Sequence, residues 1–152
     1  MLEFERTDTL HPQFISLVAR LDAFLSELNG EAHGFYAPNN KLDPEVKVVV
    51  VVLDGEPVGC GALRARGSRE VEIKRMFVDP ARRGQGIGRA ILGELEAWAK
   101  ELGHERAVLE TSRRLTPAVS LYRGKGYEPI PSYPPYDEAP DSVCMAKSLG
   151  PS

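Results

Sequence analysis

The run from Val78 to Arg89, Val-Asp-Pro-Ala-Arg-Arg-Gly-Gln-Gly-Ile-Gly-Arg, constrains the fold of this chain more than any other segment. An apolar, strand-like segment that begins at Val71 ends at Asp79, and an amphipathic helix pattern starts at the end of the run. Between them glycine occupies every second position, so backbone N–H groups can approach a ligand closely. The start of the helix adds unpaired N–H groups and the positive end of its dipole. A strand, a basic glycine-rich loop and a helix in this order predict a phosphate or pyrophosphate site.

The spacing of these glycines excludes two better-known phosphate loops. A P-loop requires Gly-x-x-x-x-Gly-Lys-Ser/Thr, which the chain lacks. A dinucleotide-binding loop requires Gly-x-Gly-x-x-Gly early in a βαβ unit, whereas here the spacing is Gly-x-Gly-x-Gly, past the middle of the chain. The remaining alternative to a phosphate site is a tight strand-to-helix connection that binds no ligand.

Hydrophobic periodicity and turn residues divide the rest of the chain into strands and helices. Strands are predicted at Leu2–Arg6, Val46–Leu53, Val58–Arg64, Glu70–Val78, Ala107–Glu110, Tyr127–Ile130 and Ser142–Ser148. Helices are predicted from Pro12 to Asn29, from the glycine loop to about Leu102, and from Pro117 to about Gly124. Residues 31–44 have no clear period and are predicted as a loop or a short helix.

Two of the predicted helices carry an apolar stripe at spacings of three and four residues, which predicts one buried face for each. The stripe of the first consists of Phe14, Leu17, Val18, Leu21, Leu25 and Leu28. The stripe of the second consists of Ile87, Ile91, Leu95, Trp98 and Leu102. Gly103 is expected to end the second helix.

The composition is that of an ordinary globular protein, and its charge excludes a nucleic-acid binder. Of the 152 residues 42% are hydrophobic and 27% are charged, and the net charge is −3. The charge is uneven, because residues 64–89 contain eight basic and three acidic side chains, a local excess of +5. This excess surrounds the glycine loop, so it favours a polyanionic ligand over a merely solvated face.

Cysteine usage and the lack of long apolar runs predict a cytoplasmic protein. Cys60 and Cys144 lie far apart in strand-like segments, and their spacing fits no metal site, so buried and reduced thiols are expected. No apolar run approaches the ~20 residues that span a bilayer, and the N-terminus does not have the pattern of a secretion signal. We expect a single domain over residues 1–152 with no membrane partner, no nucleic-acid partner and no metal.

Two signatures resemble those of the GNAT N-acetyltransferase superfamily, and the segments Glu72–Met76 and Tyr136–Leu149 resemble its branch of small bacterial acetyltransferases. Residues Arg83–Gly88 match Arg/Gln-x-x-Gly-x-Gly/Ala, the acetyl-CoA loop of that superfamily, and Ala118–Tyr127 resembles its second signature, Ala-x-x-Leu-Tyr-x-x-x-Gly-Phe/Tyr. The resemblance covers about residues 46–149, and residues 1–45 match only in the order of elements. It implies the GNAT fold, an α/β (α+β) architecture in which a twisted mixed β-sheet of about six to seven strands is flanked by helices on both faces.

The resemblance also implies acetyl-CoA as cosubstrate and assigns the residues that bind it. Backbone N–H groups of the loop are expected to take the pyrophosphate, and two arginines add charged contacts. The last residues of the preceding strand would pair with the pantetheine arm, and one backbone N–H there can stabilise the oxyanion. The complete cofactor-binding set is Met76, Phe77, Val78, Arg83, Gly84, Gln85, Gly86, Ile87, Gly88 and Arg89. Leu115 departs from the pattern, since many members carry an Asn there that faces the cofactor.

Acetyl transfer to an amine also needs a group that protonates the departing thiolate. The second signature implies Tyr122 as this general acid, because a phenol can donate a proton to a strong base such as a thiolate. The alternative for Tyr122 is a core tyrosine on an amphipathic helix.

A second group must help the amine to lose its proton, and Glu72 is the first candidate for this general base. It lies in the strand before the loop, where some family members place a catalytic glutamate, and strand alternation groups it on one face with Lys74, Met76 and Val78. The alternative is a structural ion pair. Glu110 or an ordered water is the second candidate for the base.

Four aromatic or imidazole side chains are implied to line the acceptor site, namely His33, Tyr36, Tyr133 and Tyr136. Surface or core-covering side chains are the alternative for them.

The predicted function is an acetyl-CoA-dependent N-acetyltransferase that modifies a primary amine of a small or amino-acid-like acceptor by direct transfer in a ternary complex. A protein lysine or N-terminal acetyltransferase and a non-catalytic acyl-CoA sensor are the alternatives. An exposed final strand would support a homodimer.

Overall fold

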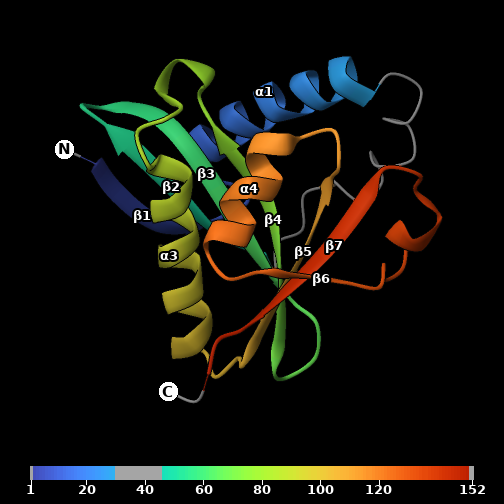
Figure 1. Ribbon diagram of the computed structural model, residues 1–152. Helices are drawn as coiled ribbons and strands as arrows, with labels where there is room; N and C mark the ends of the chain where they lie inside the picture. The colour runs from blue at the N-terminus through green and yellow to red at the C-terminus, as the bar shows by residue number, and fades with distance from the viewer. Residues whose placement is uncertain (1, 30–45, 151–152) are drawn as a thin grey trace.

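A computed structural model describes residues 2–29 and 46–150, and these form one mixed sheet of seven strands (Figure 1). The strand order is β1-β2-β3-β4-β5-β7-β6. β4 and β5 are parallel, and all other neighbours are antiparallel. The strands are β1 (Leu2–Asp8), β2 (Lys47–Leu53), β3 (Glu56–Ala65), β4 (Glu70–Val78), β5 (Arg106–Ser112), β6 (Glu128–Ile130) and β7 (Ser142–Ser148). The predicted mixed sheet is therefore confirmed.

Three α-helices among the described residues cover both faces of this sheet (Figure 1). They are α1 (Pro12–Asn29), α3 (Ile87–Glu101) and α4 (Thr116–Gly124), with 3-10 turns η3 (Pro80–Arg82) and η4 (Tyr136–Glu138). On one face Leu17 of α1 packs in a layer with Val48, and on the other Leu95 of α3 packs in a layer with Val49. Successive valines of β2 thus point to opposite layers, which explains why this strand is a continuous apolar run.

Two glycines on β3 let α3 lie close to the sheet. A Cβ atom on Gly59 would come within 2.9 Å of Ile91, and one on Gly61 would come within 2.8 Å of Leu95. At such distances a side chain on either glycine would displace the ends of the Ile91 and Leu95 side chains, which pack directly on the strand. The close packing fixes the position of α3, and with it the glycine loop that leads into the helix.

β4 and β5 pair along only part of their length. Their parallel ladder joins Glu70–Ile73 to Arg106–Leu109. β4 then continues beside β3, and β5 continues beside β7. The two strands separate beyond this point, and α4 lies over the opening (Figure 1).

β4 also contains a bulge at Arg75. This residue has a φ of 59°, and the register with β3 shifts at the same place. Ile73 before the bulge and Met76 after it both pack in the layer of α3, although they are an odd number of residues apart. A regular strand would bring only every second residue to one face, so the strand has gained one residue here.

The bulge overturns the predicted grouping of side chains on this strand. Met76 and Val78 pack in the layer of α3, as do Val71 and Ile73 on either side of Glu72. Glu72 therefore projects to the opposite face. The prediction that Glu72 and Lys74 share a face with Met76 and Val78 is wrong, because the extra residue reverses the alternation after position 74.

The end of one predicted helix and the start of one predicted strand also differ from the structure. Ile87, Ile91 and Leu95 are buried as predicted, whereas Trp98 is only partly buried and Leu102 is 45% exposed. Ala99 is buried in the last turn, whereas Leu102 is the C-cap residue and lies beyond the end of α3 at Glu101. Tyr127 is buried but precedes β6 rather than opening it.

The structure also bears on the predictions for the two cysteines and for membrane-spanning segments. Cys60 and Cys144 are both buried and unpaired, as expected. Within residues 2–29 and 46–150, no helix combines the length and the apolar character that a membrane span requires.

Candidate active site

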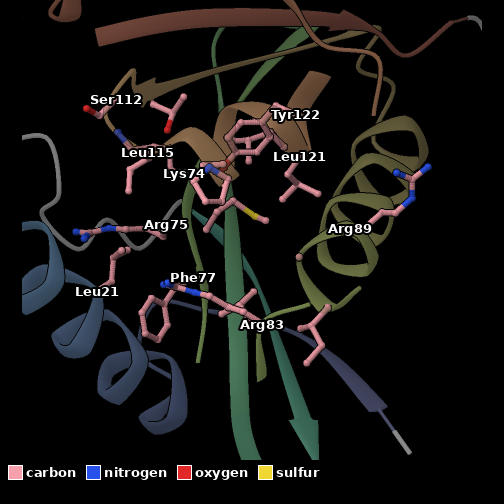
Figure 2. A pocket seen from close by; sticks show the side chains of 18 of the residues that line it. Leu21, Lys74, Arg75, Phe77, Arg83, Arg89, Ser112, Leu115, Leu121 and Tyr122 are labelled. Carbon is pink, nitrogen blue, oxygen red and sulfur yellow. The ribbon is translucent and has the colours of Figure 1, made fainter. Parts of the chain in front are cut away.

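A cavity of about 580 Å³ occupies the opening between β4 and β5 (Figure 2). Its walls come from these strands, from the glycine loop with the start of α3, and from α1 and α4. Most of the predicted site residues line it, namely Glu72, Met76, Phe77, Val78, Arg83, Gly84, Gly86, Ile87, Gly88, Arg89, Tyr122 and Tyr136. One space thus joins the glycine loop to the predicted catalytic side chains.

The glycine loop forms the end of the cavity at the N-terminus of α3. Gly84 and Gly86 have φ values of 82° and 79°, which favour glycine over any other residue. A Cβ atom on either would meet nothing within 4 Å, so the space beside their backbone is open. A Cβ atom on Gly88 would lie 3.1 Å from Leu121. The first two glycines therefore keep the backbone accessible, and the third lets α3 pack against α4.

The turn that precedes the loop is fixed by Asp79. Its carboxylate accepts a hydrogen bond from the backbone N–H of Ala81 at 3.0 Å and lies 3.2 Å from Arg20. The hydrogen bond from Ala81, with help from Arg20, lowers the pKa of Asp79. The ionised carboxylate stabilises η3, which presents Arg82 and Arg83 to the cavity.

The second half of β4 presents a backbone edge to the same cavity. Its pairing with β3 continues to Val78, whereas its pairing with β5 ends at Ile73. The side chain of Met76 packs toward α3, and that of Phe77 packs toward α1. Side chains thus occupy both faces of the strand, and the backbone groups on the β5 side face the opening.

Tyr122 on α4 lies deep in the cavity wall. It is only 6% exposed, and its ring meets that of Tyr127 edge to face with centroids 6.0 Å apart. Burial, and then the nearby Glu110, raises the pKa of Tyr122 above its ordinary value. The phenol therefore keeps its proton at neutral pH and can act as a donor.

Glu110 on β5 is a partly buried carboxyl group that also lines the cavity. It accepts a hydrogen bond of 2.6 Å from Ser142 Oγ on β7. Burial raises the pKa of Glu110 to about 7, and Glu72 adds to this while Ser142 and Lys74 oppose it. A carboxyl group with a pKa near neutrality can take up and release a proton at physiological pH.

Glu72 is buried, and it has closer partners. Tyr133 Oη donates a hydrogen bond of 3.0 Å to Glu72, and Lys74 Nζ lies 3.9 Å from it. Burial and the adjacent Glu72 raise the pKa of Tyr133. The structural ion pair, which was the alternative for Glu72, is therefore present.

Lys74 and Tyr136 lie where the main cavity adjoins a smaller one of about 290 Å³. Lys74 Nζ is 3.5 Å from Tyr136 Oη, and burial lowers the pKa of Lys74 although Glu72 opposes this. The rings of Tyr133 and Tyr136 meet edge to face with centroids 5.6 Å apart. Both tyrosines line the smaller cavity together with Arg64, Arg66, Glu72 and Lys74.

Comparison with known proteins relates this cavity to a family. The Acetyltransferase (GNAT) family model matches residues 14–127. The chain belongs to this family. The IAA acetyltransferase of Azospirillum brasilense is 32% identical over 146 residues, which cover 95% of each protein. The resemblance inferred from the two signatures is thereby confirmed, and this GNAT protein is an acetyl-CoA-dependent acetyltransferase.

Solved structures confirm the GNAT fold. The crystal structure of a proposed acyl-CoA N-acyltransferase from Klebsiella pneumoniae is 32% identical to the chain and covers 99% of each chain with a TM-score of 0.83. A GNAT family acetyltransferase from Elizabethkingia anophelis with acetyl-CoA bound has a TM-score of 0.71, 18% identity and 97% coverage of each chain. The predicted fold and the family's use of acetyl-CoA agree with these structures.

Some predicted residues lie outside the main cavity of this GNAT protein. Gln85 is exposed and does not line it, and Tyr133 lines only the smaller cavity. His33 and Tyr36 lie outside the described residues. Leu115 lines the main cavity, at the place where many GNAT proteins carry an Asn. Among residues 2–29 and 46–150, no group of three His, Cys, Asp or Glu side chains could hold a metal ion.

The reasoning from sequence gave no site role to Lys74 or Arg75. Both line the main cavity, and the bulge in β4 lies at Arg75 itself. A bulge leaves no local signal in Lys-Arg-Met-Phe, so strand alternation alone could not find it. The sequence also gives no sign of the contact between Glu110 and Ser142, because that contact depends on the pairing of β5 with β7.

Proposed function

We propose that this GNAT protein moves an acetyl group from acetyl-CoA to the primary amine of a small or amino-acid-like acceptor, by direct transfer in a ternary complex. One observation carries the proposal. A single cavity runs from the accessible backbone of the glycine loop to Tyr122 and to two carboxyl groups, the buried Glu72 and the partly buried Glu110. Acid and base candidates thus share one space with the expected phosphate site, and no covalent intermediate on the protein is needed.

The space, charge and backbone groups at the loop end of the cavity fit acetyl-CoA. Open space beside Gly84 and Gly86 leaves room for phosphate oxygens at the backbone, and Arg83 and Arg89 supply positive charge. The free edge of β4 at Met76–Val78 offers backbone groups to an extended amide chain. When bound there, acetyl-CoA supplies an activated acetyl thioester.

Two carboxyl groups are candidates for the base, and the structure favours Glu110 over Glu72. The Glu110 carboxyl has a pKa of about 7, so it can accept a proton at neutral pH. Glu72 already accepts a hydrogen bond from Tyr133 and pairs with Lys74. We therefore propose that Glu110 receives the proton of the amine, directly or through water, and that Glu72 helps by keeping the Glu110 pKa high.

Tyr122 is the proposed general acid. Its burial keeps the phenol protonated at neutral pH, so a proton donor is in place when the thiolate departs. The hydroxyl would donate its proton as the carbon–sulfur bond breaks. Tyr122 is carried by α4, and its ring packs edge to face on Tyr127, which follows the helix.

The proposal is tested by incubating the purified protein with acetyl-CoA and a library of small amines and peptides, and by measuring free CoA. We expect CoA release above background with small amines, and no release with the Gly86→Glu variant, which would block the loop. Release with lysine-containing peptides alone would favour a protein substrate. Tight acetyl-CoA binding without release for any amine would favour the acyl-CoA sensor.

A further inference from the structure

The proposed mechanism gives Arg75 no role, although its position is energetically unfavourable. Its side chain is only 5% exposed, and its backbone has a φ of 59°, a value that residues other than glycine rarely adopt. A buried arginine at a strained bulge is destabilising unless its charge and donors are satisfied. We therefore ask what the guanidinium binds.

The described residues do not provide hydrogen-bond partners for both terminal nitrogens of the Arg75 guanidinium. Nη1 donates a hydrogen bond of 3.0 Å to Asp22 of α1, whose side chain is 40% exposed. Nη2 is buried and has no hydrogen-bond partner among residues 2–29 and 46–150. A buried charged donor without a partner is unusual in folded proteins, and a missing ligand is one explanation for it.

Arg75 lies on the acceptor side of the cavity rather than at the phosphate end. Figure 2 shows its side chain extending from β4 toward Leu21 of α1, whereas Arg89 lies across the opening on α3. Arg83 and Arg89 belong to the loop end, where the pyrophosphate is expected. Arg75 is thus a separate positive group from those proposed for the cofactor.

The same cavity carries both signs of charge on this side. Glu72 and Glu110 line it together with Arg75 and Lys74. Carboxylates attract the ammonium group of an acceptor, and a guanidinium with a free N–H attracts a carboxylate. A compound that carries an amine and a carboxylate matches both features.

We propose that Arg75 Nη2 binds the carboxylate of the acceptor, so that the preferred acceptor is an amino acid or a similar zwitterion. This inference rests on the proposed N-acetyltransferase function and adds the substrate class to it. Arg75 is here a specificity-determining residue, and Tyr122 and Glu110 remain responsible for proton transfer.

The test compares each standard amino acid with its α-carboxamide as acceptor, with acetyl-CoA held constant. The carboxamide keeps the amine and the side chain and removes only the negative charge. We expect kcat/KM for the best acid to exceed that for its amide by about tenfold to a hundredfold, the range for a hydrogen bond to a charged group. The difference should lie mainly in KM.

The Arg75→Gln variant should remove this preference. Its kcat/KM for the acid should fall to about the value for the amide, which itself should change little, while the Kd for acetyl-CoA stays the same. Arg106→Gln is the matched control, because Arg106 is half exposed, pairs with Glu70 at 2.9 Å and does not line the cavity. That variant should keep the preference for the acid.

If Arg75→Gln does not fold, Asp22→Asn tests the same contact. It leaves Nη2 in place and frees Nη1, so the preference for the acid should persist or increase. Transfer to acids and amides at equal kcat/KM in the wild type would overturn the inference and leave the proposed function intact. Transfer to no amine at all would overturn the proposed function, and the inference with it.

Discussion

At the glycine-loop end of the cavity the functional groups are exposed backbone N–H groups, whereas at the β5 end they are buried side chains. Gly84 and Gly86 are exposed and have open space beside them. Tyr122 and Glu72 are buried, and burial shifts the pKa values of Tyr122 and Glu110. The first end depends on local backbone conformation, and the second depends on packing between distant elements.

This difference determines how each end should respond to substitution. At the loop end a new side chain should block binding without altering the pKa of any catalytic group. At the β5 end an isosteric change should leave binding intact and alter turnover or its pH dependence.

The largest effect is expected for Gly86→Glu. A side chain at a φ of 79° strains the loop, and the carboxylate adds a negative charge where phosphates are expected. Calorimetry should detect no acetyl-CoA binding to the variant, and acetyl-CoA should no longer raise its melting temperature. Gly93→Glu is the control, since Gly93 lies farther along α3 and a Cβ there would be 3.9 Å from Lys125. Unchanged binding by Gly86→Glu would mean that the loop holds no phosphate.

The next largest effect is expected for Tyr122→Phe, which keeps the ring and removes the proton donor. Turnover should fall by about 10²-fold or more, the range for loss of a general acid, with little change in the Kd for acetyl-CoA. Tyr127→Phe provides a control from the same core, because its hydroxyl bonds Glu96 at 2.9 Å and it does not line the cavity. That control should lose about 1 kcal/mol of stability but keep its turnover. Equal turnover in the Tyr122 variant and the wild type would make Tyr122 a core residue only.

A smaller effect, visible mainly in the pH profile, is expected for Glu110→Gln. If Glu110 is the base, wild-type kcat/KM should rise through the Glu110 pKa of about 7, and the variant should lose this inflection. Activity at pH 8 should fall by about tenfold to 10²-fold, because water can partly replace the base. An inflection that persists in the variant would exclude Glu110 as the titrating group.

The same substitution should also change stability with pH. The folded pKa of Glu110 is raised from 4.5 to about 7, so the folded state binds more proton than the unfolded state between these values. Wild-type stability should therefore fall as pH rises across this window, by up to about 3 kcal/mol. Glu110→Gln should remove this loss and melt higher than the wild type at pH 8 but not at pH 4. A lower melting temperature at pH 8 would show that the carboxylate is stabilised by the fold.

The smallest effect on turnover is expected for Glu72→Gln. The amide oxygen can still accept the hydrogen bond from Tyr133, but Lys74 loses its ion-pair partner. We expect a loss of about 1 kcal/mol in stability, a fall of less than about fivefold in kcat/KM, and a lower pH for the Glu110 inflection. A larger loss of turnover than in Glu110→Gln, with no change in stability, would restore Glu72 as the base.

The loop end could be predicted from sequence because its determinants are local. Gly84 and Gly86 are needed for their own φ values, and the helix that follows provides its own N-terminus. The second signature likewise located Tyr122 on a helix, and the structure places it in the cavity wall. A cytoplasmic location, a homodimer and a single domain remain predictions.

The β5 end could not be predicted in the same way, because it depends on contacts between elements far apart in the chain. The bulge at Arg75 reverses strand alternation, so the predicted grouping of Glu72 with Met76 on one face is wrong. The pKa of Glu110 is shifted by its burial at a point where β5 pairs with β7 but no longer with β4, and Ser142, which bonds it, is distant in sequence.

The sequence by itself determined the order of elements, the glycine loop and the family, since periodicity, backbone conformation and short signatures are properties of neighbouring residues. The tertiary structure decided where β4 and β5 separate, which side chains enter the cavity and what their pKa values are. These features arise from desolvation and charge across the sheet, and both depend on distances that no local pattern encodes.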